Sequence, residues 1–468
     1  MVFSSIFFLC VFLPIVVVIY YGLPKQLRNL WLLLASLFFY AWGEPRYILI
    51  MLFSTVFDYF NGRAIAYATD KGKHDTWGRA VLVLSVVGNL AILCFFKYTD
   101  FVLETVNRLA GTQIGLLQLV LPIGISFYTF QTMSYTIDVY REETPAQKNI
   151  ISFGMYVCLF PQLIAGPIVR YQDVQREVDV RTETVADMTH GLQRFLVGLG
   201  KKVLLANQIG VLWDYIKGLG SADMSMALAW LGALAFTFQI YFDFSGYSDM
   251  AIGLGEMFGF HFPENFDHPY ESKSITEFWR RWHMTLGTWF REYVYIPLGG
   301  NRKGLARQVC NLFIVWFLTG LWHGAGWNFI LWGLYYFVLL VLEKFVLRRI
   351  APRVPAWLQH LYTMFFVVVG WVIFACDDMT LLGSYFKALF GIGVPVGNAL
   401  AAYEWDILAP FLIILTLAAT TIPVRIAKQI VEPKRRSAFL MVYSVILLFL
   451  SLAFLVSGSY NPFLYFRF

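Results

Sequence analysis

Residues 309–342 read VCNLFIVWFLTGLWHGAGWNFILWGLYYFVLLVL and contain no Asp, Glu, Lys or Arg. A membrane-crossing helix needs roughly 20 apolar residues, so the stretch is too long for a single crossing. Basic residues flank it on both sides, at Arg302, Lys303, Arg307, Lys344, Arg348, Arg349 and Arg353. Because Lys and Arg concentrate in cytoplasmic loops, both ends are expected in the cytoplasm. The stretch therefore predicts a hairpin that enters the membrane and returns.

The natural break in this hairpin is His323-Gly324-Ala325-Gly326. A helix that starts near Cys310 rises about 1.5 Å per residue and would carry His323 roughly 20 Å into a hydrocarbon core of about 30 Å. An imidazole at that depth is most often a hydrogen-bonded core residue, and the alternative is a functional group facing a cavity.

The composition of the whole chain agrees with a membrane protein. Its 468 residues are 58% hydrophobic, 18% aromatic and only 14% charged, and the mean hydropathy is +0.61. Such a chain has too few polar side chains to cover a soluble globule. The net charge of +6 is small for a chain of this size, and no basic tract suggests nucleic-acid binding.

The expected fold class is an all-α polytopic membrane protein. We expect about 11 or more transmembrane helices together with re-entrant and interfacial helices, in a single membrane-embedded domain over residues 1–468. Lys25 and Arg28 follow the first span, which places the N-terminus outside the cytoplasm. The segment 457–468, after the last span, should emerge on the same outer side. The spans expected besides the hairpin are Phe3–Tyr21, Leu30–Trp42, Tyr47–Phe60, Ala80–Phe96, Leu116–Tyr135, Ile150–Ile164, His190–Trp213, Ala227–Phe242, Leu361–Ala375, Leu381–Phe390, Ile407–Ile422 and Phe439–Val456.

The longest hydrophilic region, residues 261–307, nevertheless carries an apolar stripe at helical spacing. The stripe consists of Ile275, Phe278, Trp279, Trp282, Leu286, Trp289, Phe290 and Tyr293. Its period predicts one amphipathic helix lying in the cytoplasmic interface, with Arg280 and Arg291 on the polar face. His283 would lie at the edge of the stripe, where its side chain could face a cavity.

A third polar feature follows the span at 227–242. Tyr241–Asp249 contains two carboxylates next to apolar helices, and its residues Asp243, Ser245 and Tyr247 are candidates for the polar wall of a cavity. An interfacial loop with satisfied helix caps explains the same residues equally well.

The two histidines suggest acid–base chemistry. Imidazole has a pKa near 6.5, so His323 and His283 suit the removal of a hydroxyl proton near neutral pH. Arginine binds phosphate well, so the basic segment could hold the phosphates of a soluble donor, and its candidates are Arg280, Arg281, Arg291, Asn301 and Arg302. The chain has no Gly-x-Ser-x-Gly, Walker, dinucleotide-binding or His-Glu-x-x-His pattern, and no metal site is expected.

Several motifs together resemble the membrane-bound O-acyltransferases, and within them the bacterial branch that O-acetylates extracellular polysaccharides such as alginate. They are Trp279–His283, Leu298–Gly304, Trp322–Gly324, Met1–Ser5, Leu121–Tyr128, Ala165–Pro167 and Tyr241–Gly253. The resemblance covers nearly the whole chain.

The resemblance implies a multi-helix bundle around a central tunnel, in the bacterial inner membrane, with both termini periplasmic. His323 would match the catalytic histidine of the family and His283 its second active-site position, with Trp279, Trp282 and Trp322 as tunnel-lining candidates. The donor would be cytoplasmic acetyl-CoA, and no bound cofactor is implied. The acetyl group would pass to a periplasmic or membrane-anchored acetyltransferase partner, which would modify the exopolysaccharide.

The C-terminal tail also resembles this branch. Its aromatic run, residues 463–468, includes Tyr465, whose hydroxyl is a candidate acyl relay on the outer side. The alternative is an aromatic residue that anchors the last helix at the membrane interface.

Two other classes of function remain open from the sequence. A transporter or polysaccharide export component would also have broken polar helices, but should show internal repeats and paired intramembrane charges. A scaffold whose partners carry out the chemistry would be insensitive to the loss of His323. The identity of the polysaccharide cannot be read from this chain.

Overall fold

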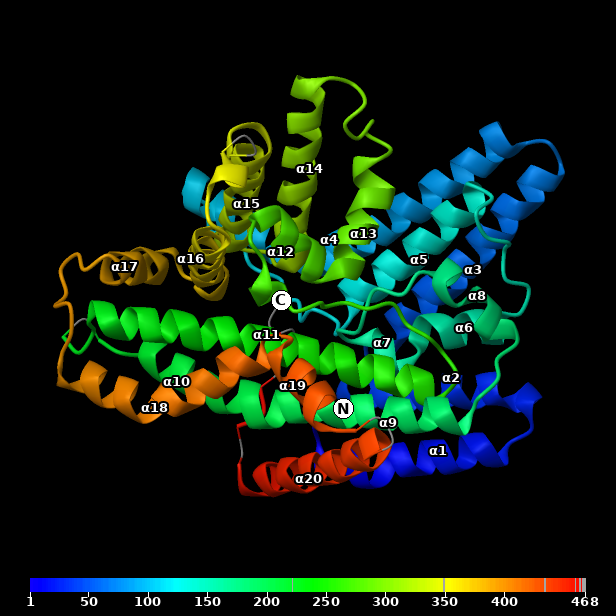
Figure 1. Cartoon of the computed structure of the whole chain (residues 1–468). Helices are drawn as coiled ribbons and strands as arrows, with labels where there is room; N and C mark the ends of the chain where they lie inside the picture. Colours follow the sequence, from blue (N-terminus) through cyan, green and yellow to red (C-terminus); the bar gives the residue numbers. More distant parts are fainter. Residues whose placement is uncertain (221, 348–349, 433–434, 459, 463, 465–468) are drawn as a thin grey trace. The chain divides into compact units, whose positions relative to one another are not determined.

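The computed structural model confirms an all-helical membrane fold (Figure 1). It describes residues 1–468 except 221, 348–349, 433–434, 459, 463 and 465–468. Over the described residues there is no β-strand, only an isolated bridge between Phe266 and Trp282. Nine helices in this part of the chain are long and apolar enough to cross a membrane, and the shorter apolar helix Phe8–Gly22 occupies the place of the first expected span.

The chain forms two compact units. The first comprises Met1–Phe195 and Tyr247–Pro263, and the second comprises Leu196–Gly246 and Glu264–Phe468. The helices of the first unit are α1 (Leu13–Gly22), α2 (Lys25–Gly43), α3 (Ile48–Asp70), α4 (Arg79–Ala110), α5 (Ile125–Tyr140), α6 (Ile150–Cys158), α7 (Phe160–Leu163) and α8 (Tyr171–Asp179). Two helices, α9 (Val185–Gly200) and α11 (Met226–Met257), contribute residues to both units. Those of the second unit are α10 (Asn207–Lys217), α12 (Ile275–Arg281), α13 (Met284–Phe290), α14 (Leu305–His323), α15 (Trp327–Phe345), α16 (Ala356–Ala375), α17 (Met379–Leu389), α18 (Ala399–Ala418), α19 (Ile422–Ile430) and α20 (Arg436–Ser457).

In the first unit, α3, α4 and α5 bury a polar network. Asp58 of α3 accepts hydrogen bonds from the hydroxyl of Ser85 and the amide of Asn89, both at 2.7 Å. Thr136 of α5 lies 2.9 Å from the Ser85 hydroxyl, and all of these side chains are buried. Polar groups inside a bilayer need protein or water partners, and Thr136 of α5 has a protein partner in Ser85. The span expected over Leu116–Tyr135 is wrong in its first half, because residues 111–124 are not helical and α5 begins at Ile125.

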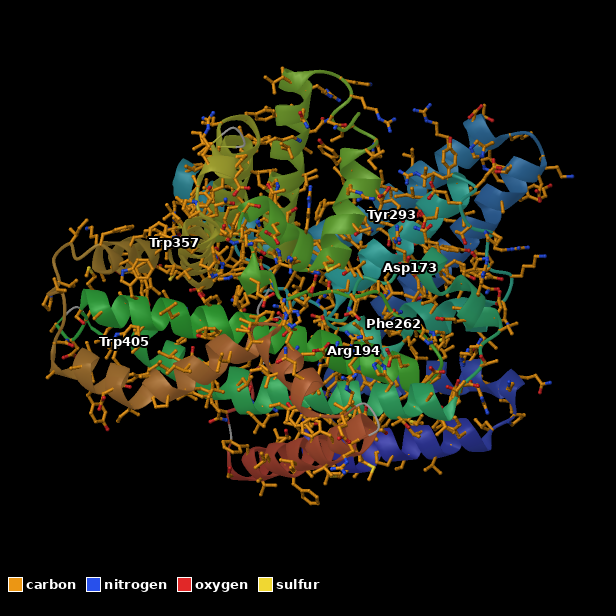
Figure 2. All side chains as sticks on the ribbon, in the orientation of Figure 1. Asp173, Arg194, Phe262, Tyr293, Trp357 and Trp405 are labelled. Carbon is orange, nitrogen blue, oxygen red and sulfur yellow. The ribbon has the colours of Figure 1, made fainter. Side chains whose placement is uncertain are left out.

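Tyr241–Asp249 is neither a loop nor a helix end. It lies inside α11, a continuous helix of 32 residues, so the interfacial-loop interpretation is wrong. In the first unit its last residue, Asp249, pairs with Arg194 of α9 at 3.1 Å, and Arg194 is labelled in Figure 2. In the second unit Trp405 of α18, also labelled there, donates its indole N–H to the backbone oxygen of Ala227, at the start of α11 (3.1 Å).

The hairpin expected over residues 309–342 is confirmed. Its arms α14 and α15 lie side by side, and the chain turns at Gly324–Gly326 (Figure 1). Two glycines allow the arms to approach closely: a Cβ on Gly320 would lie 2.4 Å from the carbonyl oxygen of Phe329, and one on Gly333 would lie 2.4 Å from that of Trp316. Small residues at such crossings are typical of helix pairs in membranes.

The single amphipathic helix expected between residues 275 and 293 is wrong. The segment forms two short helices, α12 and α13, followed by a π-helical turn at Arg291–Tyr295. The break falls at Trp282–His283, and His283 has a left-handed backbone conformation with φ +45°. At this break the backbone of Trp282 pairs with that of Phe266 in an isolated β-bridge, and the helix does not continue.

Candidate functional site

His323 is the last residue of α14, immediately before the turn of the hairpin. Its ring is packed edge-on against three aromatic rings of Trp322, Trp332 and Phe374, with centroids 5.0 to 5.2 Å away. Only 5% of the residue is exposed. The hairpin and α16 therefore hold this imidazole in a fixed orientation inside the second unit.

His283 is held at the break between α12 and α13. Its Nδ1 lies 3.0 Å from Oδ1 of Asn265, and the same oxygen accepts the backbone N–H (3.3 Å) and the hydroxyl (2.9 Å) of Thr285. A backbone N–H can only donate, so the Asn265 atom is the oxygen and Nδ1 of His283 carries the proton. Nε2 is then the unprotonated nitrogen, and among the described residues it has no hydrogen-bond partner.

Burial also fixes the charge state of His283. Desolvation lowers the pKa of this imidazole to about 3, because the surrounding protein penalises the charged form. The ring of Phe244 packs edge-on against it at 4.7 Å. His283 is therefore a neutral imidazole with a free lone pair on Nε2 at physiological pH.

Both histidines line one cavity of about 190 Å³. Trp279 and Trp282, two of the tunnel-lining candidates, line it as well, together with Trp316 and Thr319 of α14. Trp322 lies against both imidazoles, with ring centroids 5.8 Å from His283 and 5.1 Å from His323. The structure thus brings the two histidines together with Trp279 and Trp282 around a small, largely aromatic space, and Trp322 packs against both imidazoles without lining it.

The three polar candidates from Tyr241–Asp249 do not line this cavity. Asp243 forms a buried ion pair with Lys202 at 2.5 Å, and its other oxygen accepts the backbone N–H of Leu464 at 3.0 Å. Ser245 is buried elsewhere in α11, and Tyr247 stacks on Phe3 within the first unit (4.6 Å).

The five donor-binding candidates are not gathered at one place. Arg291 lines the histidine cavity, whereas Arg280 lines a different one. Arg281 is engaged by Glu277 at 2.9 Å. Asn301 and Arg302 lie exposed in the turn before α14.

The structure adds residues that sequence patterns did not identify. Asn265 orients His283 from 18 positions away in the chain, and Trp332 and Phe374 hold His323 from α15 and α16. A lone Asn in a polar loop carries no signal of this role. Trp332 had a weak one, since it lies nine residues past His323 on the returning arm of a predicted hairpin.

Tyr465, the candidate acyl relay, lies outside the described residues. The tail before it is docked within the second unit: Lys202 donates to the carbonyl oxygen of Pro462, and Tyr460 donates its hydroxyl to Asp214 at 2.7 Å.

Comparison with known proteins points in the same direction as the site. Residues 91–386 match the model of MBOAT, the membrane-bound O-acyltransferase family. The probable alginate O-acetylase AlgI of Pseudomonas aeruginosa is 46% identical over 398 residues, which is 84% of this chain and 75% of that protein. The peptidoglycan O-acetyltransferase of Helicobacter pylori is 34% identical over 84% of this chain and 80% of its own length. The teichoic acid D-alanyltransferase of Bacillus subtilis is 30% identical over 48% of this chain and 59% of its own.

Proposed function

We propose a function for this chain, which belongs to the membrane-bound O-acyltransferase family. It moves acetyl groups from cytoplasmic acetyl-CoA across the bacterial inner membrane, and these groups are used for O-acetylation of an extracellular polysaccharide. The observation that carries this proposal is a cavity that is lined by both His283 and His323. Relatives that act on alginate and on peptidoglycan support a glycan as the final acceptor.

His323 acts as the general base in this proposal. It removes the proton of the attacking hydroxyl while that oxygen bonds to the thioester carbonyl carbon; the C–S bond breaks, and the thiolate of CoA takes up a proton as it leaves. A positioned base of this kind is worth about 10² to 10⁴ in rate. The neutral His283 offers its Nε2 lone pair as a hydrogen-bond acceptor beside the reacting groups.

The donor enters from the cytoplasm past Arg291. Among the five candidates this arginine lines the histidine cavity, and its side chain is 67% exposed. It pairs with Glu292 at 2.6 Å, so an anionic donor at the cavity mouth would compete with that carboxylate for the guanidinium. Arg302, Lys303 and Arg307 precede α14 and support a cytoplasmic location for this end of the hairpin. Both chain termini are then periplasmic.

The acetyl group leaves on the opposite side to a periplasmic or membrane-anchored acetyltransferase partner. Such a partner completes the reaction on the polymer and selects the polysaccharide. Tyr465, near the end of the chain, remains the candidate relay for this step. Membership of an acyltransferase family weighs against a transporter or a passive scaffold.

The test is transfer of labelled acetyl from acetyl-CoA in sealed inverted vesicles. His323→Ala should lower the rate by about 10² to 10⁴. His190→Ala is the matched control, because His190 is 68% exposed at the side chain and does not line the cavity, and it should keep the wild-type rate. A normal rate in folded His323→Ala would refute the assigned chemistry.

A further inference from the structure

The second unit contains another cavity, of about 710 Å³, between α12, α14, α15 and the start of α16. Six of its fourteen lining residues are aliphatic: Leu312, Leu340, Leu347, Ile350, Val354 and Leu358. Its volume and apolar walls suit hydrocarbon, and Leu312 is a wall that it shares with the histidine cavity.

Three cationic side chains, Lys273, Arg280 and Lys344, lie among the lining residues and are exposed. The single carboxylate of the lining, Glu343, is already engaged. It accepts the backbone N–H of Ile275 at 2.6 Å, and it accepts the N–H and the hydroxyl of Thr276 at 2.9 and 2.8 Å. The opening therefore presents positive charge to a ligand.

The polar side chains of the lining are largely committed as well. Gln359 donates its amide to the carbonyl oxygen of Val354 at 2.8 Å, and Ser274 caps α12 by accepting the N–H of Glu277 at 3.0 Å. The pantetheine arm of CoA carries two amides that would need partners, and burying them without partners is unfavourable. An acyl chain needs none.

We infer that this cavity binds an anionic phospholipid, with its phosphate at Lys273, Arg280 and Lys344 and one acyl chain between α14, α15 and α16. Basic pockets between helices on the cytoplasmic side of a membrane commonly hold anionic headgroups. Exposed apolar side chains at Ile350, Trp357 and Leu361 flank the site, and Trp357 is labelled in Figure 2. The inference goes beyond the proposed function and does not depend on acyl transfer.

The test is lipid binding to the purified full-length protein in detergent, measured by native mass spectrometry with dioleoyl-phosphatidylglycerol and dioleoyl-phosphatidylcholine. The wild type should retain the first lipid and release the second. Lys273→Gln with Lys344→Gln should weaken phosphatidylglycerol binding about fivefold for each lysine. The matched control, Lys71→Gln with Lys73→Gln, removes the same charge from an exposed loop and should change nothing.

A second variant tests the part of the cavity that would hold the acyl chain, independently of the basic residues that would bind the phosphate. Leu340→Trp fills the cavity without changing its charge, and should abolish retention of phosphatidylglycerol in protein that elutes and unfolds as the wild type does. Equal retention of the two lipids would refute headgroup recognition. Displacement of phosphatidylglycerol by acetyl-CoA, with donor affinity lost in the double-lysine variant, would assign the cavity to the donor and overturn the inference.

Discussion

His283 shows how one hydrogen bond defines the chemistry of a residue. The Oδ1 atom of Asn265, fixed by Thr285, places the proton on Nδ1 and leaves the lone pair on Nε2. The surrounding protein then keeps the ring uncharged. The sequence shows that His283 lies at the edge of a tryptophan-rich amphipathic stripe. It does not show the tautomer of the imidazole, because that depends on the contact with Asn265, 18 positions away in the chain.

The charge state of His283 makes the stability of the protein depend on pH. Its pKa is about 3 when folded and near 6.5 when unfolded, so between these values the unfolded state binds more protons and stability falls as the pH is lowered. Wild type should lose about 1 kcal/mol more per pH unit below pH 6 than His283→Gln does. Denaturant titrations at pH 7 and pH 5 measure this difference, with His190→Gln as the exposed control. Identical pH dependence in wild type and His283→Gln would show that the imidazole is already charged or solvated in the native state.

The ion pair of Lys202 and Asp243 is a second effect at the residue scale. The two side chains are 3% and 2% exposed, and the pair also binds the backbone of the C-terminal tail. Asp243→Asn leaves a buried ammonium without its counter-charge and should lower the free energy of unfolding by about 3–5 kcal/mol. Adding Lys202→Met should restore most of that loss.

An exposed pair provides the control for this measurement. Glu432→Gln breaks its pairing with Arg435, in which both side chains are more than two-thirds exposed, and should cost less than about 1 kcal/mol. Equal effects of Asp243→Asn and Glu432→Gln in thermal unfolding would show that the Lys202 pair is solvated.

At the scale of the element, the hairpin could be predicted and the interfacial segment could not. A charge-free stretch of this length with a glycine-rich centre is expected to form a helical hairpin in a bilayer, and α14 and α15 form one. The apolar residues from Ile275 to Tyr293 recur at helical spacing although the helix breaks at His283. Both short helices, α12 and α13, bury aromatic residues in the same unit, so the sequence pattern is the same on either side of the break. Periodicity cannot reveal a one-residue change of backbone conformation that is stabilised by Asn265 and Phe266.

The close approach of the hairpin arms gives a prediction for the element. Gly333→Leu would place a Cβ 2.4 Å from the carbonyl oxygen of Trp316, so α14 and α15 must separate. The expected loss is about 1–3 kcal/mol of stability together with reduced acetyl transfer, since His323 ends α14. Thermal unfolding and the vesicle assay measure the two effects.

Gly383 of α17 is the matched position, because a Cβ there meets nothing within 4 Å. Gly383→Leu should leave both readings near the wild-type values. Wild-type behaviour of Gly333→Leu would mean that the two arms are not closely packed at this crossing.

At the scale of the whole molecule, composition predicted the class of protein and the family resemblance predicted the two histidines. The division into two units could not be predicted from the sequence, because α9 and α11 run through both. One boundary, at Pro263–Glu264, does fall in the longest hydrophilic region, but that region carries an apolar stripe and contributes helices to the second unit. The polar residues of α11 illustrate the same limit. Asp243 is a carboxylate next to apolar helices, as expected of a cavity wall, yet it binds Lys202 and the backbone of Leu464 in the C-terminal tail. These partners come from distant parts of the chain, so the sequence pattern could not reveal them.

The three hydrogen bonds of Glu343 have a mechanical consequence. They attach the first residues of α12 to the far end of α15, while the last residue of α12 leads directly into the break at His283. The start of α12 is thus fixed to the hairpin that carries His323. Glu343 thereby links the element that leads to His283 with the hairpin that carries His323, and loss of its carboxylate would leave the start of α12 without these three hydrogen bonds to α15.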